Sequence, residues 1–126
     1  MPPEATKTVV AVLNDLMFQA RILDAAKRTG HTVRIAKSQT EALALAQECP
    51  VLIILDLNNS IAEPLDLIGK LKAGEQTRPI PLLGYVSHVQ TDLRREAVEH
   101  GCERVVARSI FFDTLRELLA SAEAAI

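Results

Sequence analysis

Residues 51–71 read VLIILDLNNSIAEPLDLIGKL, and this stretch decides the fold. Its first five residues form an uninterrupted apolar run, which is typical of a central parallel strand buried on both faces. Asp56 follows the run directly. Pro64 fits the first turn of a helix that ends near Gly74 and turns three apolar side chains inward, those of Leu67, Ile68 and Leu71.

The same alternation of strand and helix continues outward to both ends of the chain. Ser38 and Glu41 have the S-x-x-E spacing of a capping box and predict the start of the second helix. The last helix is expected at residues 111–124. The predicted strands are residues 8–13, 32–36, 51–55, 80–86 and 103–107. Five β/α units imply a doubly wound, five-stranded parallel sheet of the α/β class with five helices and the strand order 2-1-3-4-5.

Size and composition exclude several classes of protein. The 126 residues fit a single domain, residues 1–126, and the 48% of apolar residues suffice for one core. Fourteen basic and sixteen acidic residues give no attraction to nucleic acid or to an anionic membrane, so neither partner is expected. Cys49 and Cys102 have no CxxC partner, which indicates free thiols in a reducing compartment. The longest apolar run is too short to span a bilayer, and a cytoplasmic location is expected.

The candidate site lies at the carboxyl ends of the strands, where ligands bind in doubly wound sheets. Asp15 follows the first strand, which neighbours the third strand and Asp56 in this winding. Two close carboxylates both stay ionised only with a cation between them, and oxygen ligands suit Mg²⁺. With such an ion in place, Asp56 would attack a phosphoryl group. The alternative is that both aspartates only cap the helices or loops that follow them.

The chain resembles a known family over essentially its whole length. The quoted stretch resembles the phosphoacceptor segment of bacterial response-regulator receiver domains, the CheY-like family. VVAVLND, residues 9–15, resembles the first strand of that family with its acidic pair. CERVVARSIFFDTLRELL, residues 102–119, resembles the fifth strand, the basic residue after it and the last helix. The resemblance implies a flavodoxin-like fold and two-component phosphorelay signalling.

The resemblance also assigns roles to single residues. Asp56 corresponds to the phosphoacceptor and, with Asp15, to the metal-binding acids. Asn58 falls where the family supplies a main-chain carbonyl to the metal. Asn14 stands in place of the first acid, so Mg²⁺ is expected to bind weakly. Arg108 replaces the family's lysine and is expected to contact the phosphoryl group.

Several positions depart from the family pattern. Val86 stands where a Thr or Ser hydroxyl usually grips the phosphoryl group, and Ser87 substitutes only if the strand end shifts by one residue. Val105 replaces an aromatic switch residue. Ser109 replaces a cis-proline, so no cis bond is expected before it. The chain is therefore expected to be an atypical, degenerate receiver.

Three residues near these positions have plain structural interpretations. Tyr85 is the only tyrosine, and strand alternation predicts that it packs on the face opposite Val86. His88 is interpreted as a solvated loop residue or a helix-start contact. Of Phe111 and Phe112, one is expected to anchor the core and the other to contact a partner.

Three functions compete. The favoured one is a receiver phosphorylated on Asp56 by a histidine kinase or phosphotransfer protein, with output to a downstream protein through the fourth helix, the fifth strand and the fifth helix. The second is a pseudo-receiver, a protein–protein interaction module that does not depend on phosphorylation. An enzyme is disfavoured because the turn after the first strand, residues 14–18, is neither Gly-rich nor Ser/Thr-rich as flavin or dinucleotide binding requires.

Overall fold

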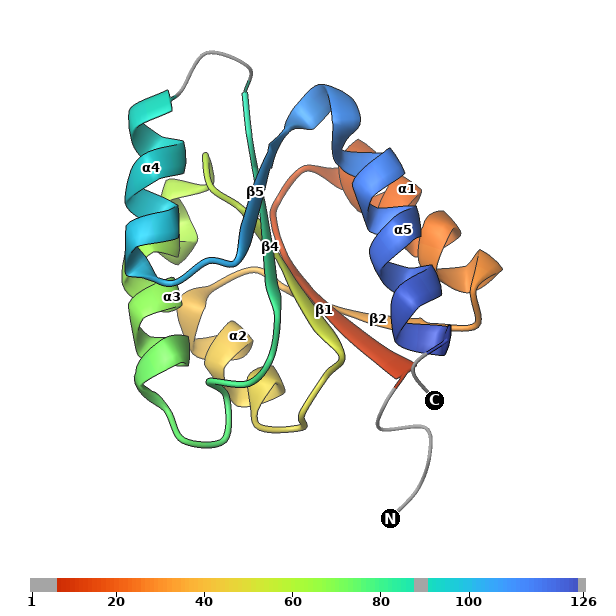
Figure 1. The fold of residues 1–126 in the computed structure, drawn as a ribbon, viewed down its shortest axis with the longest axis horizontal. Coiled ribbons are helices and arrows are strands. Elements are labelled where there is room, and N and C mark those ends of the chain that lie inside the picture. The colour runs from red at the N-terminus through yellow and green to blue at the C-terminus, as the bar shows by residue number, and fades with distance from the viewer. Residues whose placement is uncertain (1–6, 88–90, 125–126) are drawn as a thin grey trace.

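The computed structural model describes residues 7–87 and 91–124 (Figure 1). Five parallel strands form one sheet in the order β2-β1-β3-β4-β5, which confirms the predicted topology. The strands are β1 Thr8–Val12, β2 Thr32–Ala36, β3 Leu52–Asp56, β4 Leu82–Val86 and β5 Arg104–Ala107. The helices are α1 Leu16–Arg28, α2 Gln39–Ala46, α3 Pro64–Ala73, α4 Thr91–His100 and α5 Phe111–Ala124, with short 3₁₀ turns η2 Ser60–Ala62 and η3 Arg108–Ile110.

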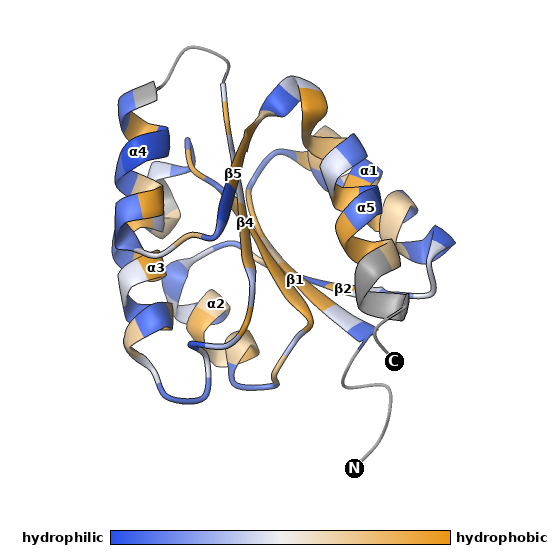
Figure 2. Cartoon of the chain, in the orientation of Figure 1, coloured by the Kyte–Doolittle hydropathy of each residue, from blue (hydrophilic) through white to orange (hydrophobic). Residues whose placement is uncertain are grey.

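Helices cover both faces of the sheet. Figure 1 shows α1 and α5 on one side and α2, α3 and α4 on the other. Each face has its own apolar core, because alternate residues of each strand point to opposite sides. Figure 2 shows that β1 and β4 are largely hydrophobic, as expected for strands covered on both faces. Since β3 lies between β1 and β4, its last residue sits at the centre of the carboxyl edge.

Strand ends differ from the predicted bounds by one or two residues. β3 begins at Leu52 and includes Asp56, whereas the sequence placed Asp56 just beyond the strand. β4 begins at Leu82 because Pro81 has no N–H to donate, although the Pro81 carbonyl still accepts a hydrogen bond from Ile53 N at 3.0 Å. The predicted last helix, residues 111–124, is confirmed at both ends.

The predicted capping box opens α2. The Ser38 hydroxyl accepts a hydrogen bond from Glu41 N at 3.2 Å. The Glu41 carboxylate accepts from Lys37 N at 2.7 Å, one residue before the Ser38 N–H that the motif usually uses. Two main-chain donors at this helix start are therefore satisfied by side chains.

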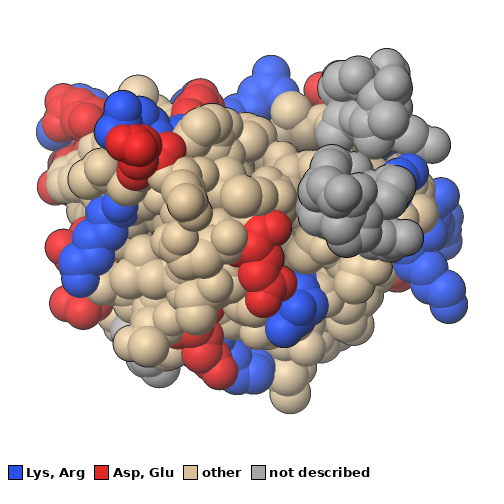
Figure 3. Space-filling view, turned by 90° about the horizontal axis from the view of Figure 1, so that it is seen from below, with Lys and Arg blue, Asp and Glu red and all other residues tan. Residues whose placement is uncertain are grey.

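The surface carries mixed charge. On the face shown in Figure 3, acidic and basic side chains lie among one another and do not separate by sign. Among the described residues, no helix is long and apolar enough to cross a membrane.

Candidate functional site

The site is built at the carboxyl edge of the sheet, where β1, β3, β4 and β5 end side by side. Asp56 is the last residue of β3, and Asp15 lies between β1 and α1. Ser87 follows β4, and Arg108 follows β5. Parallel pairing brings these four residues to one edge although up to 93 positions separate them along the chain.

Asp15 has two partners, one for each carboxylate oxygen. Oδ1 accepts a hydrogen bond from Phe18 N at 3.0 Å, so Asp15 is the N-cap of α1. Oδ2 accepts from Arg108 Nη2 at 2.6 Å. The Phe18 hydrogen bond and then the Arg108 hydrogen bond hold the pKa of Asp15 below its ordinary value. Asp15 is thus a helix cap, as the structural alternative stated, and also half of an ion pair across the site.

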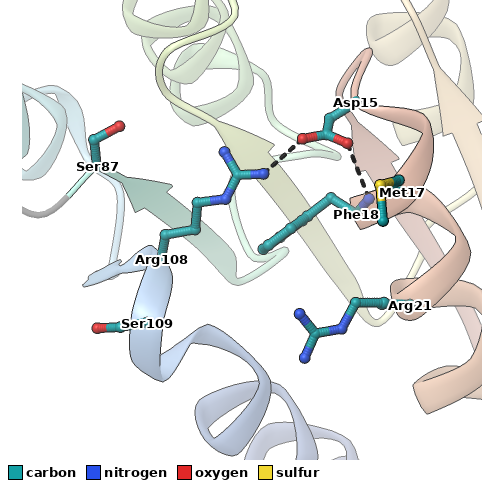
Figure 4. A pocket seen from close by; sticks show the side chains of 7 residues that line it. All are labelled: Asp15, Met17, Phe18, Arg21, Ser87, Arg108 and Ser109. Carbon is teal, nitrogen blue, oxygen red and sulfur yellow. Dashed lines mark hydrogen bonds and ion pairs between the residues drawn. The ribbon is translucent and has the colours of Figure 1, made fainter.

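Arg108 reaches this ion pair by lying over an aromatic ring. Its guanidinium carbon is 4.5 Å from the centre of the Phe18 ring (Figure 4). The side chains of Arg108 and Asp15 are 47% and 35% exposed, so water screens their attraction and the pair adds at most about 1 kcal/mol to stability. Its main effect is to fix where the positive charge lies. The described peptide bonds include no cis bond, as predicted for Arg108–Ser109.

Asp56 is half-buried at the end of the central strand. Its Oδ1 accepts a hydrogen bond from Asn58 N at 2.9 Å. Burial, the largest cause, raises the pKa of Asp56; the Asn58 N–H and the charge of Arg108 oppose that rise, and the charge of Asp15 adds to it. The structure therefore brings Asp15, Asp56 and Arg108 within electrostatic reach of one another.

Asn58 and Ser87 tie the β3 loop to the end of β4. Asn58 Oδ1 accepts hydrogen bonds from Ser87 N at 3.1 Å and from the Ser87 hydroxyl at 3.4 Å. β4 ends at Val86, as counted from the sequence, and the Val86 side chain is buried in the core on the α2–α4 side. The Ser87 hydroxyl is thus turned toward Asn58.

Tyr85 is the site residue that the sequence interpretation missed. It pairs with Asp56 in the register of β3 and β4, and its ring packs on the face opposite Val86, as alternation predicted. Its hydroxyl is fully buried and makes no hydrogen bond of normal geometry among the described residues. Burial, and next the charge of Asp56, raise the pKa of Tyr85. The register of two adjacent strands was the signal that could have placed this hydroxyl beside Asp56.

An open groove of about 540 Å³ adjoins the site (Figure 4). Arg21 lies on its α1 wall with its guanidinium carbon 4.1 Å from the centre of the Phe112 ring. Phe111 is fully buried, so it is the core anchor of the predicted pair, whereas Phe112 is half-buried beneath Arg21. The groove is lined by Asp15, Met17, Phe18, Arg21, Ser87, Arg108 and Ser109. Two arginines held on aromatic rings make it a place where an anion can be bound. His88 lies outside the described residues.

The donor set fits a weakly held divalent cation better than a tight one. No group of three His, Cys, Asp or Glu side chains in the described part of the chain could enclose a metal ion. The available oxygens are the carboxylates of Asp15 and Asp56 and main-chain carbonyls, which suit Mg²⁺ with several waters. Because Arg108 already bonds to Asp15 Oδ2, its guanidinium competes with a metal ion for the Asp15 carboxylate.

Comparisons with known proteins agree with this fold. No family model matches the chain. The polar-differentiation response regulator DivK of Brucella ovis is 26% identical over 122 residues, which are 93% of this chain and 99% of DivK. A response regulator from Hahella chejuensis has a similar fold, with a TM-score of 0.82, 19% identity and coverage of 93% of this chain and 95% of that one.

A third similar protein is the receiver domain of the sensor histidine kinase PA1611 from Pseudomonas aeruginosa, solved with a magnesium ion coordinated in its active-site cleft. Its TM-score is 0.80 at 15% identity, covering 92% of this chain and 96% of that one. Full-length similarity to DivK and the 2-1-3-4-5 sheet lead to one conclusion: the chain has the CheY-like, flavodoxin-like fold and is similar along its length to response-regulator receiver domains.

Proposed function

We propose that this receiver domain accepts a phosphoryl group on Asp56 from a histidine kinase or a phosphotransfer protein. One observation carries the proposal: Asp56 ends the central strand, half-exposed, at the point where Asp15 and Arg108 act on its charge. The chain then serves as a cytoplasmic signalling protein and not as a metabolic enzyme. Its net charge of −2 favours protein partners over nucleic acid or membrane.

Each site residue has its own role in the proposed phosphoryl transfer. Asn58 N holds Oδ1 of Asp56, which leaves the second oxygen to attack phosphorus. A bond forms between that oxygen and phosphorus while the bond from phosphorus to the donor's imidazole nitrogen breaks, and the donor keeps that electron pair. Arg108 lies at the same edge with donors for the phosphoryl oxygens. Mg²⁺ on Asp15, Asp56 and the Asn58 carbonyl would neutralise charge on those oxygens.

The proposed output surface is formed by α4, β5 and α5. α4 presents Val98, an apolar side chain that is 51% exposed. β5 leads directly into Arg108, and α5 begins three residues later. A change at the phosphoryl site therefore has a short covalent route to this surface, through η3.

The test is phosphorylation by a small donor. Incubation of the chain with Mg²⁺ and acetyl phosphate should add one phosphoryl group, detected by intact mass and mapped to Asp56 by peptide analysis. Asp56→Asn should gain none. Asp24→Asn, which removes an exposed carboxylate of α1, should gain one as the wild type does. An unmodified wild type, or a modified Asp56→Asn, contradicts the proposal.

The alternative is a pseudo-receiver that binds its partner without phosphorylation. It is supported by Val86, which offers no hydroxyl, and by the Ser87 hydroxyl, which is already bonded to Asn58. Arg108 also occupies Asp15 before any phosphoryl group arrives. Asp56→Asn distinguishes the two functions in cells. Signalling that survives this change supports the pseudo-receiver, and signalling lost from a folded variant contradicts it.

A further inference from the structure

Tyr85 occupies an unusual position beside the phosphoacceptor. It is the register partner of Asp56 on the adjacent parallel strand, so both side chains leave the sheet on the same face. Its side chain is 1% exposed, its hydroxyl makes no hydrogen bond of normal geometry among the described residues, and the Asp56 carboxylate lies near enough to raise the pKa of that hydroxyl. A buried phenol keeps its proton and acts as a donor, and leaving that donor unpaired is unfavourable.

The ring cannot turn its hydroxyl toward water. Phe18 packs against it with ring centres 4.5 Å apart, and Phe111 does so from α5 at 4.9 Å. Phe18 is itself covered by the Arg108 guanidinium. The hydroxyl is thus confined beneath the site by aromatic packing.

Neither of the two residues that follow Tyr85 offers Asp56 a hydroxyl donor. Val86 has none, and its side chain lies in the core of the opposite face. The Ser87 hydroxyl is directed at Asn58. Oδ1 of Asp56, which the Asn58 N–H holds, can accept a second hydrogen bond, so the attacking oxygen stays free. The Tyr85 hydroxyl is therefore a buried donor on the residue that pairs with Asp56, and the Asp56 carboxylate can still accept a hydrogen bond.

We propose that the Tyr85 hydroxyl donates a hydrogen bond to the Asp56 carboxyl group from the sheet side, and so supplies the donor that position 86 lacks. Tyr85 acts through Asp56 as a positioning residue, and its kinetic role rests on the proposed phosphorylation of Asp56. With the donor in place, the Asp56 carboxylate is held in one orientation, with its attacking oxygen toward the groove.

The first test uses tyrosine fluorescence. Tyr85 is the only tyrosine and the chain has no tryptophan, so emission excited at the phenol band reports this residue alone. A carboxylate that accepts a hydrogen bond from a phenol quenches its emission. Asp56→Asn should therefore brighten the emission. Asp24→Asn removes an exposed carboxylate of α1 and should leave the emission unchanged. Equal emission from the wild type and a folded Asp56→Asn variant overturns the proposal.

The second test uses Tyr85→Phe, which keeps the ring packing and removes only the hydroxyl. Its phosphorylation by acetyl phosphate and Mg²⁺ should be slower by about tenfold, the effect of losing one hydrogen bond to a charged group. Circular dichroism checks that the variant is folded. Equal rates for the wild type and Tyr85→Phe overturn the role of Tyr85 while the phosphorylation of Asp56 stands. A wild type that is not phosphorylated, with emission that still rises in Asp56→Asn, contradicts the proposed function and supports the hydrogen bond.

Discussion

At the scale of a single residue, the half-buried position of Asp56 disfavours the ionised form of its carboxyl group. Its pKa in the folded chain lies above the ordinary value of 3.8, chiefly because burial disfavours the ionised form. The folded state then binds the Asp56 proton more tightly than the unfolded state does. The ionised carboxylate therefore lowers stability at neutral pH, and this loss is removed as the pH falls below 3.8, where both states are protonated.

Asp56→Asn is accordingly expected to raise the free energy of unfolding at neutral pH, by on the order of 1 kcal/mol. The amide keeps an oxygen for the Asn58 N–H and removes the charge. Urea unfolding across the acid range should show the advantage shrinking toward zero at low pH. An advantage that stays constant with pH would mean that the gain comes from something other than the charge of Asp56.

Sequence patterns predicted some residues of the candidate site and missed others. Asp56 was predictable because an apolar run must end at a sheet edge, and the acid after it marks that end. Asp15 was placed for the same reason. The bond from Arg108 to Asp15 was not predictable, because it depends on the Phe18 ring carrying the guanidinium across the groove. The Tyr85 hydroxyl was missed because alternation gives the face of a side chain but not its partner on the next strand.

At the scale of an element, α2 depends on its cap. It is an eight-residue helix, too short to be stable by itself, and Ser38 satisfies one of its free N–H groups. Ser38→Ala should lower the free energy of unfolding by about 1 kcal/mol. Ser60→Ala is the matched control, because Ser60 is exposed and lies inside η2, whose N-cap is Asn59. Chemical denaturation of both variants tests the difference, and equal losses would contradict the capping role.

β4 depends on a glycine where it passes the loop after β3. A Cβ added at Gly84 would lie 3.0 Å from Leu57 Cδ1 and 3.2 Å from Leu57 Cγ. Leu57 is buried next to Asp56, so its displacement would disturb the loop that carries Asn58. Gly84→Ala should cost about 1–3 kcal/mol of stability.

Gly84→Ala should also shift the amide resonances of residues 57 and 58 in a two-dimensional NMR spectrum. Gly69→Ala is its control, because the nearest atom to a Cβ there is 3.9 Å away. A Gly84→Ala variant that is as stable as the wild type, with unchanged loop resonances, would show that the Leu57 side chain can move aside without loss of stability.

Element boundaries also separate what sequence predicts from what it does not. Helix ends followed local signals, Ser38 for α2 and Pro64 for α3, because caps act within one turn of chain. Several strand ends shifted by one or two residues because they depend on the neighbouring strand. β4 starts after Pro81 and not at Ile80, since pairing with β3 decides which donors are used.

At the scale of the whole molecule, a bound ion adds its binding free energy to the stability of the fold. Mg²⁺ at a concentration equal to its Kd should stabilise the chain by about 0.4 kcal/mol, or roughly 1–2 °C in Tm. Arg108→Ala frees Asp15 Oδ2 and removes a positive charge, so the Tm gain at the same Mg²⁺ concentration should be larger. Arg21→Ala removes a positive charge from the same groove but leaves Asp15 Oδ2 bonded, and its gain should match the wild type more closely. Asp56→Asn should show almost none. Thermal unfolding followed by circular dichroism measures all four, and an equal gain in Arg108→Ala and the wild type would show that the guanidinium does not compete with the ion for Asp15.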